Sequence, residues 1–328
     1  MIKKVLETIK KYNLIENGDR IVLGVSGGPD SITMLDILRQ LREELEFEIV
    51  VAHINHMIRE EAIEDEKYVQ EYCKKNNIEC YIKRIDVEKI ANTKKIGTEE
   101  AGRKVRYEFF EEILQKTGSN KIGIAHNKND KIETIIMHIL RGSGISGLKG
   151  IEPKRDNKYI RPLIECERSE IEQYCEENKL EPRIDKTNFE NEYTRNKIRN
   201  IVIPYIKKEF NPNIIETMNR LSELITEEDN YLEKETQKIY NKILLEKNDK
   251  QIILKLKEFN EQETVIKNRI IILVTKNLFG SSEGIEKIHI QDLIKLCNNN
   301  IGNKYLTPNK NLKVLVKNRK IFFISQKD

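Results

Sequence analysis

Short apolar runs rich in Ile and Val alternate with longer segments of helical period through the first half of the chain. The apolar runs cover residues 21–25, 47–53, 80–85 and 121–125, and the helical segments cover 31–45, 60–75, 98–116 and 130–141. This alternation predicts an α/β fold with an open parallel sheet and helices on both faces. Ligands of such sheets bind beyond the carboxyl ends of the strands, so the loops that follow the apolar runs are the candidate sites.

The pattern changes in the second half of the chain. Pro204 and Pro212 bracket a boundary, and residues 214–247 read as one long helix dense in Glu and Lys. Beyond it, apolar residues alternate at 252–256, helical segments follow at 264–278 and 290–298, and strand-like runs occupy 312–316 and 320–325. We therefore expect a first domain over residues 1–212, a helical linker over 213–250 and a small α/β C-terminal domain over 251–328.

The net charge of +4 is too small to indicate a partner, but the basic residues are unevenly spread. Residues 193–208 hold five basic residues and no acid, and residues 302–328 hold seven basic residues against Asp328 alone. These patches suit a polyanion, although a solvated basic face explains them too.

The cysteine pattern and the hydropathy indicate an intracellular protein. The five cysteines are scattered and form no Cys-x-x-Cys pair, which argues against a disulfide framework or a zinc ribbon. Residues 1–15 lack the continuous apolar core of a signal peptide. No window approaches the ~20 apolar residues of a membrane span. We expect a cytoplasmic protein without a membrane partner.

The run Ser26-Gly27-Gly28-Pro29-Asp30-Ser31 follows the first predicted strand and precedes a helix. Two adjacent glycines let a ligand approach the backbone, and the helix start and the serine hydroxyls offer hydrogen-bond donors to a phosphate. The alternative is an ordinary turn in which Asp30 or Ser31 caps the helix. A turn does not need the whole run, so a phosphate site is the favoured interpretation.

A second group of polar residues, His126, Asp130, Glu133 and Thr134, begins where the fourth apolar run ends. Asp130 and Glu133 are three residues apart and share a helix face in the first turn, where the helix dipole favours carboxylates. Capping alone would explain them. Beyond a parallel strand, the same pair could bind an amino group, orient Mg²⁺ or accept a proton.

Two further groups are weaker signals. Arg103 and Arg106 share a helix face and suit a phosphate, although Glu99 and Glu100 could pair with them. His53 and His56 follow the second apolar run, and no Cys or third His accompanies them. We therefore expect no metal site made of protein ligands alone.

The run at residues 26–31 matches the PP-loop signature of the N-type ATP pyrophosphatases. Over residues 20–200 the chain resembles the tRNA(Ile)-lysidine synthetases, and its tail over 288–325 resembles their small tRNA-contacting domain more weakly. Asn127 stands where many members carry a second His, and Gly102 where Ala is usual. The segments that carry the resemblance are Ala52-His53-Ile54-Asn55-His56, Glu100-Ala101-Gly102-Arg103 with Arg106-Tyr107, Ala125-His126 with Asp130 and Glu133-Thr134, Arg161-Pro162-Leu163, and Asp185-Lys186-Thr187-Asn188 with Arg195-Asn196 and Arg199.

The resemblance implies an ATP-dependent ligase that acts on the wobble cytidine of a tRNA(Ile) with a CAU anticodon. In that reaction O2 of the cytidine attacks the α-phosphate of ATP, held with Mg²⁺, and pyrophosphate leaves. The ε-amine of L-lysine then attacks C2, and AMP leaves. Because a free lysine amine is almost fully protonated at neutral pH, a base or desolvation must free its lone pair.

The resemblance also implies roles for individual residues. Asp130 and Glu133 are expected to position lysine and accept its proton, Arg103 to stabilise phosphate charge, and Asp30 to orient the metal or the phosphates. The tRNA backbone is expected to contact Arg195, Arg199, Lys313 and Lys317. The residues expected at ATP are Ser26, Gly27, Gly28, Pro29, Asp30, Ser31, His53 and His126.

Other interpretations stay open. Another PP-loop enzyme, such as a tRNA thiolase or an amide-forming amidotransferase, would share the ATP chemistry, and a non-catalytic tRNA-binding module would share the basic patches. The lack of Cys-x-x-Cys disfavours thiolation, and the complete PP-loop disfavours the module. The chain resembles either a short family form or a truncated one, and the sequence leaves the oligomeric state open, a homodimer included.

Overall fold

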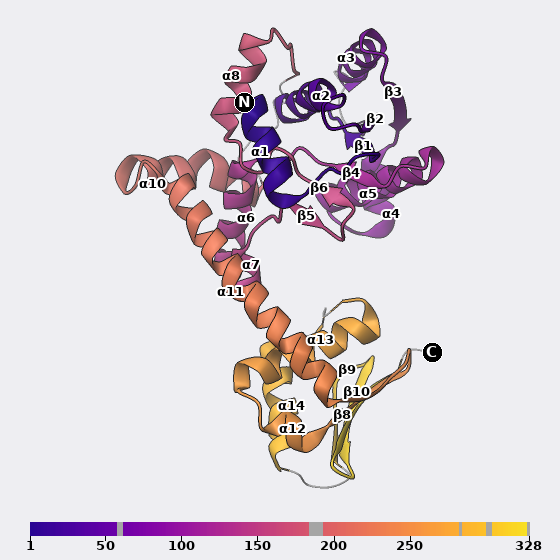
Figure 1. Cartoon of the computed structure of the whole chain (residues 1–328), viewed down its shortest axis with the longest axis vertical. Helices are drawn as coiled ribbons and strands as arrows, with labels where there is room; N and C mark the ends of the chain where they lie inside the picture. Colours follow the sequence, from indigo (N-terminus) through magenta and orange to yellow (C-terminus); the bar gives the residue numbers. More distant parts are fainter. Residues whose placement is uncertain (58–61, 184–192, 282–283, 300–303, 327–328) are drawn as a thin grey trace. The chain divides into compact units, whose positions relative to one another are not determined.

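The computed structural model describes residues 1–57, 62–183, 193–281, 284–299 and 304–326 (Figure 1). The chain forms two compact units, Met1–Ile225 and Thr226–Asp328. The helix α11 (Ile214–Ile243) begins in the first unit and ends in the second. The expected division at residues 212 and 250 stays a prediction. No helix in the described ranges is long and apolar enough to cross a membrane.

The first unit contains a six-stranded sheet in the order β3-β2-β1-β4-β6-β5 (Figure 1). All neighbours pair in parallel except β5 and β6, which pair antiparallel. The predicted α/β sheet is therefore confirmed, with an antiparallel hairpin at one edge that the prediction lacked. The strands are β1 (Arg20–Gly24), β2 (Glu48–Asn55), β3 (Glu79–Arg84), β4 (Lys121–Gly123), β5 (Lys154–Arg155) and β6 (Tyr159–Ile160).

The edge hairpin turns at Asp156 and Asn157. Both residues have a positive φ, of 54° and 52°, which Asp and Asn tolerate better than most residues. The two strands are only two residues long each, so no alternation of apolar and polar residues was there to reveal them.

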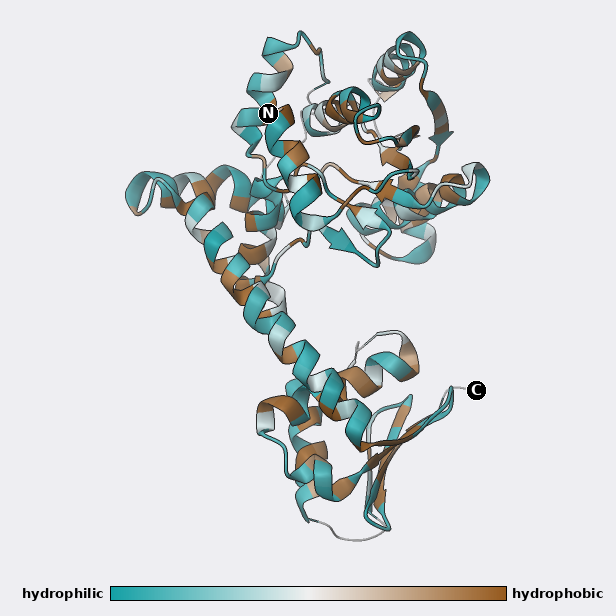
Figure 2. Ribbon diagram, in the orientation of Figure 1, coloured by the Kyte–Doolittle hydropathy of each residue, from teal (hydrophilic) through white to brown (hydrophobic). Residues whose placement is uncertain are grey.

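Successive residues of β1 enter different cores, as the period of a strand requires. Ile21 and Leu23 pack in the core on one face, and Val22 packs in the core on the other face. Helices therefore cover both faces, as predicted (Figures 1 and 2). The first face holds α1 (Ile2–Tyr12), α2 (Pro29–Leu41), α3 (Ala62–Lys75) and α8 (Arg168–Glu177), and the second holds α5 (Thr98–Thr117).

The topology places two loops beside each other at one edge of the sheet. From β1 the chain proceeds to β2 and β3 on one side, and it returns to β4 on the other side. The loop from β1 to α2 and the loop from β4 to α6 (Lys128–Leu140) therefore leave the carboxyl ends of neighbouring parallel strands. Such a reversal of strand order is where open α/β sheets bind ligands.

Short helices after residue 193 pack against α6. They are α9 (Thr194–Lys197), the π-helix η2 (Ile198–Val202) and α10 (Ile203–Glu209). Ile132 and Ile135 of α6 share an apolar cluster with Ile198 and Ile203, and with Ile215 at the start of α11. This cluster fixes the basic segment around residue 199 over the first turns of α6.

The second unit contains a five-stranded antiparallel sheet in the order β7-β8-β11-β10-β9. The predicted long helix is wrong at its end, because the residues after Ile243 form β7 and pair with β8.

The strands of the second unit are β7 (Leu244–Lys247), β8 (Gln251–Lys255), β9 (Lys304–Asn309), β10 (Leu312–Lys317) and β11 (Lys320–Ser325). Its helices after α11 are α12 (Leu256–Asn260), α13 (Thr264–Phe279) and α14 (Lys287–Asn299). The first unit also contains α4 (Val87–Lys94) and α7 (Ile145–Leu148).

The packing of α5 on the sheet depends on a glycine. A Cβ at Gly24 would lie 2.3 Å from Cζ of Phe110, which is closer than atoms can approach. We expect Gly24→Ala to lower the free energy of unfolding by about 1–3 kcal/mol, measured by urea denaturation. Gly144→Ala, where a Cβ meets nothing within 4 Å, is the control. Equal stability of both variants would contradict this packing.

Candidate active site

The loop at residues 26–31 is held by the hydroxyl of Ser31. Its Oγ accepts from the backbone N–H of Ser26 at 3.1 Å and of Gly27 at 3.2 Å, and donates to the carbonyl of Gly28 at 3.0 Å. Gly27 has a φ of +95°, which favours glycine. The Ser31 hydroxyl is thus used inside the loop, which fixes the loop around the start of α2.

The start of α2 lacks a capping side chain. The N-cap residue is Gly28, and among the described residues its position offers no side-chain acceptor to the first turn. The alternative of an ordinary turn capped by Asp30 or Ser31 is therefore wrong. Uncapped N–H groups and the helix dipole make this helix start a suitable anion site.

His53 lies near the end of β2, beside the loop at residues 26–31. Its Nδ1 lies 2.8 Å from the carbonyl oxygen of Val25, and the residue is 2% exposed. Burial lowers the pKa of His53, so the imidazole is neutral and Nδ1 donates to that carbonyl. Within the described ranges, Nε2 has no hydrogen-bond partner. A buried acceptor therefore lies beside the loop, ready for an N–H or O–H group of a ligand.

Asp30 connects the loop to α6. Its Oδ1 accepts from Nδ2 of Asn127 at 2.8 Å. Burial and the charge of Asp130 raise the pKa of Asp30 to about 6. Two carboxylates that repel each other beside an anion site fit a cation such as Mg²⁺, which proteins bind through one or two carboxylates together with phosphate oxygens.

Asp130 both caps α6 and presents an oxygen to the site. Its Oδ2 accepts from the N–H of Asn127 at 3.1 Å, and Oδ1 of Asn127 accepts from the N–H of Asp130 at 3.0 Å. This capping box uses one carboxylate oxygen and leaves Oδ1 for other partners. The capping interpretation of Asp130 is therefore confirmed, and its role in an active site stays a prediction. Asn127, where many family members carry a His, supplies a link that the sequence did not reveal.

Glu133 lies one turn further along α6, and its side chain is 1% exposed. Arg199 donates to both of its oxygens, from Nε at 2.6 Å and from Nη2 at 2.8 Å. The same Nη2 lies 3.0 Å from Oδ1 of Asp130. One guanidinium thus bridges the carboxylate pair. Such bidentate pairs are the strongest that side chains form.

Two more arginines surround the pair. Nη2 of Arg168 lies 3.7 Å from Oδ1 of Asp130 and 3.7 Å from Oε1 of Glu133. Arg195 donates from Nη2 to Thr134 at 2.8 Å, and its Nε lies 3.6 Å from Oε2 of Glu133. We call Arg168, Arg195 and Arg199 the arginine cluster. Arg168 was not predicted from the sequence. Its position at the start of α8, shortly after the Arg161-Pro162-Leu163 segment, is the feature that could have indicated it as a site residue.

His126 and Arg103 lie at the same end of the sheet. Nε of Arg161 donates to Nδ1 of His126 at 3.2 Å, so the proton of the neutral ring is assigned to Nε2. Burial, with a contribution from nearby arginines that include Arg103, lowers the pKa of His126 to about 4. Arg103 is exposed, and its guanidinium lies 5.2 Å from the ring centre of Tyr107. His126 therefore offers a neutral donor, and Arg103 an exposed positive charge.

Two predicted residues, Lys313 and Lys317, belong to the second unit. Lys313 and Lys317 alternate along β10 with the buried Leu312, Val314 and Val316, so the two lysines share the other face of the strand. Nζ of Lys313 lies 4.4 Å from the ring centre of Tyr305, which is 57% exposed. The segment Asp185-Lys186-Thr187-Asn188 lies outside the described residues.

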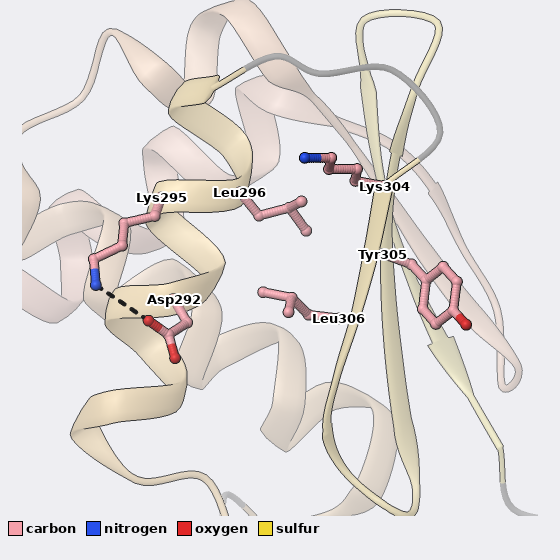
Figure 3. Close-up of a pocket in the computed structure, with 6 residues that line it drawn as sticks. All are labelled: Asp292, Lys295, Leu296, Lys304, Tyr305 and Leu306. Carbon is pink, nitrogen blue, oxygen red and sulfur yellow. Dashed lines mark hydrogen bonds and ion pairs between the residues drawn. The ribbon is translucent and has the colours of Figure 1, made fainter.

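The second unit also has an open pocket between α14 and β9 (Figure 3). Asp292 and Lys295 form an ion pair of 3.2 Å on the helix side. The lining residues are Asp292, Lys295, Leu296, Lys304, Tyr305 and Leu306. None of the residues predicted from the sequence lines this pocket.

The chain is similar to known proteins in its first domain and over most of its length. Residues 1–206 match the PP-loop domain family. The chain is 49% identical to the tRNA(Ile)-lysidine synthase of Clostridium acetobutylicum over 310 residues, which are 94% of this chain and 67% of that protein. It is 43% identical to the tRNA(Ile)-lysidine synthase of Clostridioides difficile over 324 residues, which are 98% of this chain and 70% of that protein.

The match to a third relative covers slightly less of that protein's length. The tRNA(Ile)-lysidine synthase of Clostridium perfringens is 46% identical over 303 residues, which are 92% of this chain and 64% of that protein. Among solved structures, the U34-tRNA thiolase NcsA of Methanococcus maripaludis has a TM-score of 0.58 at 18% identity, over 69% of this chain and 78% of that one. That likeness shows a shared fold. The chain thus spans about two thirds of the relatives it matches.

The charge of Asp30 should oppose folding in the ligand-free protein. Its pKa rises from 3.8 in the unfolded chain to about 6, so stability is lost as the pH rises between these two values. Asp30→Asn keeps an acceptor for Asn127 and removes that charge. We expect it to raise the free energy of unfolding near pH 8 by on the order of 1–3 kcal/mol, and to change nothing below the lower pKa.

Urea denaturation across this pH range measures the effect. Asp249→Asn, at an exposed position of the second unit, is the control for the loss of one carboxylate. An Asp30→Asn variant that is no more stable than the wild type near pH 8 would contradict the raised pKa.

Proposed function

Because the chain belongs to the tRNA(Ile)-lysidine synthase family, we propose that it joins L-lysine to C2 of the wobble cytidine in a tRNA(Ile) with a CAU anticodon, converting ATP to AMP and pyrophosphate. The observation that carries the proposal is the buried carboxylate pair Asp130 and Glu133 beside Asp30 of the PP-loop. The carboxylate pair suits an amine, and the PP-loop with Asp30 suits a nucleotide.

ATP would bind with its phosphates at the uncapped start of α2. The Nε2 of His53 would accept from an N–H or O–H group of the nucleoside, since it is a buried acceptor without a partner among the described residues. Mg²⁺ would be held by Asp30 and would neutralise part of the phosphate charge. These assignments are supported by the loop geometry and by the raised pKa of Asp30.

The first step would adenylate the base. O2 of the cytidine attacks the α-phosphate, the bond between this phosphate and the β-phosphate breaks, and pyrophosphate leaves. Negative charge on the phosphate oxygens would be stabilised by the Nε2–H of His126 and by the Arg103 guanidinium. O2 then becomes part of a good leaving group.

The second step would use lysine as the nucleophile. Its ammonium is almost fully protonated at neutral pH, so it first needs anionic partners and then a base. Asp130 commits one oxygen to the capping box, whereas both oxygens of Glu133 contact an arginine side chain that a substrate amine can displace. We therefore assign the base to Glu133. The freed amine attacks C2, the C2–O2 bond breaks, and AMP leaves with O2.

Contacts to the tRNA are proposed for two places. Lys313 and Lys317 share a face of β10 with an aromatic ring nearby, which suits a sugar–phosphate backbone. Arg195 and Arg199 were predicted to do the same, but in this structure both lie against Glu133. A role for them at the tRNA would require these ion pairs to open. The cytoplasmic location and a homodimer stay predictions.

The thiolase alternative is not favoured by a specific observation. The U34-tRNA thiolase shares 18% identity with the chain, which shows the fold and not the reaction. The relatives named for lysidine synthesis share 43–49% identity over most of the chain.

Transfer of labelled lysine into a CAU-anticodon tRNA(Ile) transcript, with ATP and Mg²⁺, tests the function. We expect acid-stable, ATP-dependent incorporation, and none into a tRNA(Met) transcript with the same anticodon. Pyrophosphate release without lysine incorporation would show that the nucleophile is a different one.

The same assay tests the base. We expect Glu133→Gln to lower the rate of lysine transfer by about 10²–10⁴-fold, because a positioned base contributes that much. Adenylation, followed as tRNA-dependent pyrophosphate release, should fall much less. Glu108→Gln, at an exposed position of α5, is the control. Full lysine transfer by Glu133→Gln would contradict the assignment.

The tRNA contact of β10 is tested by the salt dependence of binding. We expect Lys313→Ala and Lys317→Ala each to weaken tRNA binding and to reduce the slope of log K against log salt by roughly one. Lys257→Ala, at an exposed position of α12, should keep the slope. If the affinity of the wild type for tRNA did not change with salt, neither lysine would contact the tRNA backbone.

A further inference from the structure

The carboxylate pair proposed to receive the lysine ammonium already holds a cation. The guanidinium of Arg199 contacts both oxygens of Glu133 and Oδ1 of Asp130, at 2.6, 2.8 and 3.0 Å. These are the oxygens that remain after the capping box has used Oδ2 of Asp130. An incoming ammonium would therefore compete with Arg199 for the same acceptors.

The two cations do not fit together on these oxygens. Arg168 and Arg195 already lie within 3.7 Å of the pair, so three guanidinium groups surround its two carboxylates. A further ammonium next to the guanidinium would add a like-charge repulsion at close range, which is costly at a buried site. One of the two cations must leave for the other to bind.

Arg199 lies on a π-helical turn and near a second acidic residue, Asp30. It lies inside the π-helix η2, where the N–H of Ile203 donates to the carbonyl of Ile198. Single π-turns are uncommon and concentrate at functional sites, since a change of register there turns the side chains. The charge of Arg199 acts on Asp30 of the PP-loop. A phosphate bound at that loop would therefore be a neighbouring anion for Arg199.

We propose that Arg199 is an internal counterion that exchanges with the substrate: it leaves Asp130 and Glu133 when lysine binds and pairs with a phosphate of the nucleotide on the PP-loop. This inference rests on the proposed function and deepens it. Each ligand then favours the other, because the nucleotide draws Arg199 away from the lysine site, and lysine releases Arg199 to the phosphate. Such a coupling is reciprocal by thermodynamic necessity. Without a nucleotide, Arg199 would occupy the carboxylate pair, and lysine would bind there only weakly.

Calorimetric titration of the full chain with L-lysine tests the exchange, without nucleotide and with the Mg²⁺ complex of α,β-methylene-ATP. For the wild type we expect the analogue to tighten lysine binding by about fivefold or more. For Arg199→Gln we expect lysine to bind more tightly than to the wild type without nucleotide, and the analogue to add nothing. A residue that only supports the fold would give the opposite sign when removed.

Arg168→Gln is the matched control. It removes the same charge from the same carboxylates, but Arg168 approaches them only to 3.7 Å, whereas Arg199 contacts them at 2.6 to 3.0 Å. It should keep the coupling between lysine and the analogue. Arg199→Lys, which retains a charge without the bidentate contact, should show intermediate lysine affinity and a coupling of the same sign. This variant tests the proposal even where Arg199→Gln unfolds.

The outcomes separate the two proposals. Weaker lysine binding by Arg199→Gln without nucleotide, or coupling that survives in this variant, overturns the counterion exchange while lysine transfer to tRNA still supports the function. No lysine binding to the wild type under either condition, together with no transfer to tRNA, overturns the proposed function and the exchange with it.

Discussion

The ion pairing of Asp130 and Glu133 is the constraint on which the site depends. Buried carboxylates without partners are costly, and an uncompensated one would take up a proton or move to the surface. Here the chain brings the arginine cluster to them from two later segments, α8 and the turns around η2. The apolar cluster between α6 and these turns holds that arrangement in place. The arginine cluster therefore compensates the buried carboxylate pair.

Much of the fold is predictable from local patterns. The Ile and Val runs, their helical neighbours and the PP-loop signature place the sheet and its ligand-binding edge, because the alternation of strands and helices leaves few topologies. The edge hairpin β5–β6 and the strand β7 were missed for a physical reason. Each is too short to show a period, and β7 continues the composition of the helix that precedes it.

The site was predictable only in part. Asp130, Glu133 and the PP-loop have local signals, in spacing and in their position after strands. The partners of Glu133 lie 35, 62 and 66 residues away along the chain, and nothing local in the basic segment around residue 199 distinguishes a buried ion pair from a surface patch. The density of basic residues there suggested a polyanion, whereas the fold turns two of them inward. Long-range charge pairing is what the sequence pattern does not show.

In the proposed exchange, the carboxylate pair gives up an internal cation for the lysine amine. A crystal structure of the full chain with L-lysine and the Mg²⁺ complex of α,β-methylene-ATP would show both groups at once. We expect the lysine Nζ within hydrogen-bond distance of Asp130 and Glu133, with the Arg199 guanidinium at a phosphate. Lysine bound elsewhere, with the contacts between Arg199 and Glu133 intact, would contradict it.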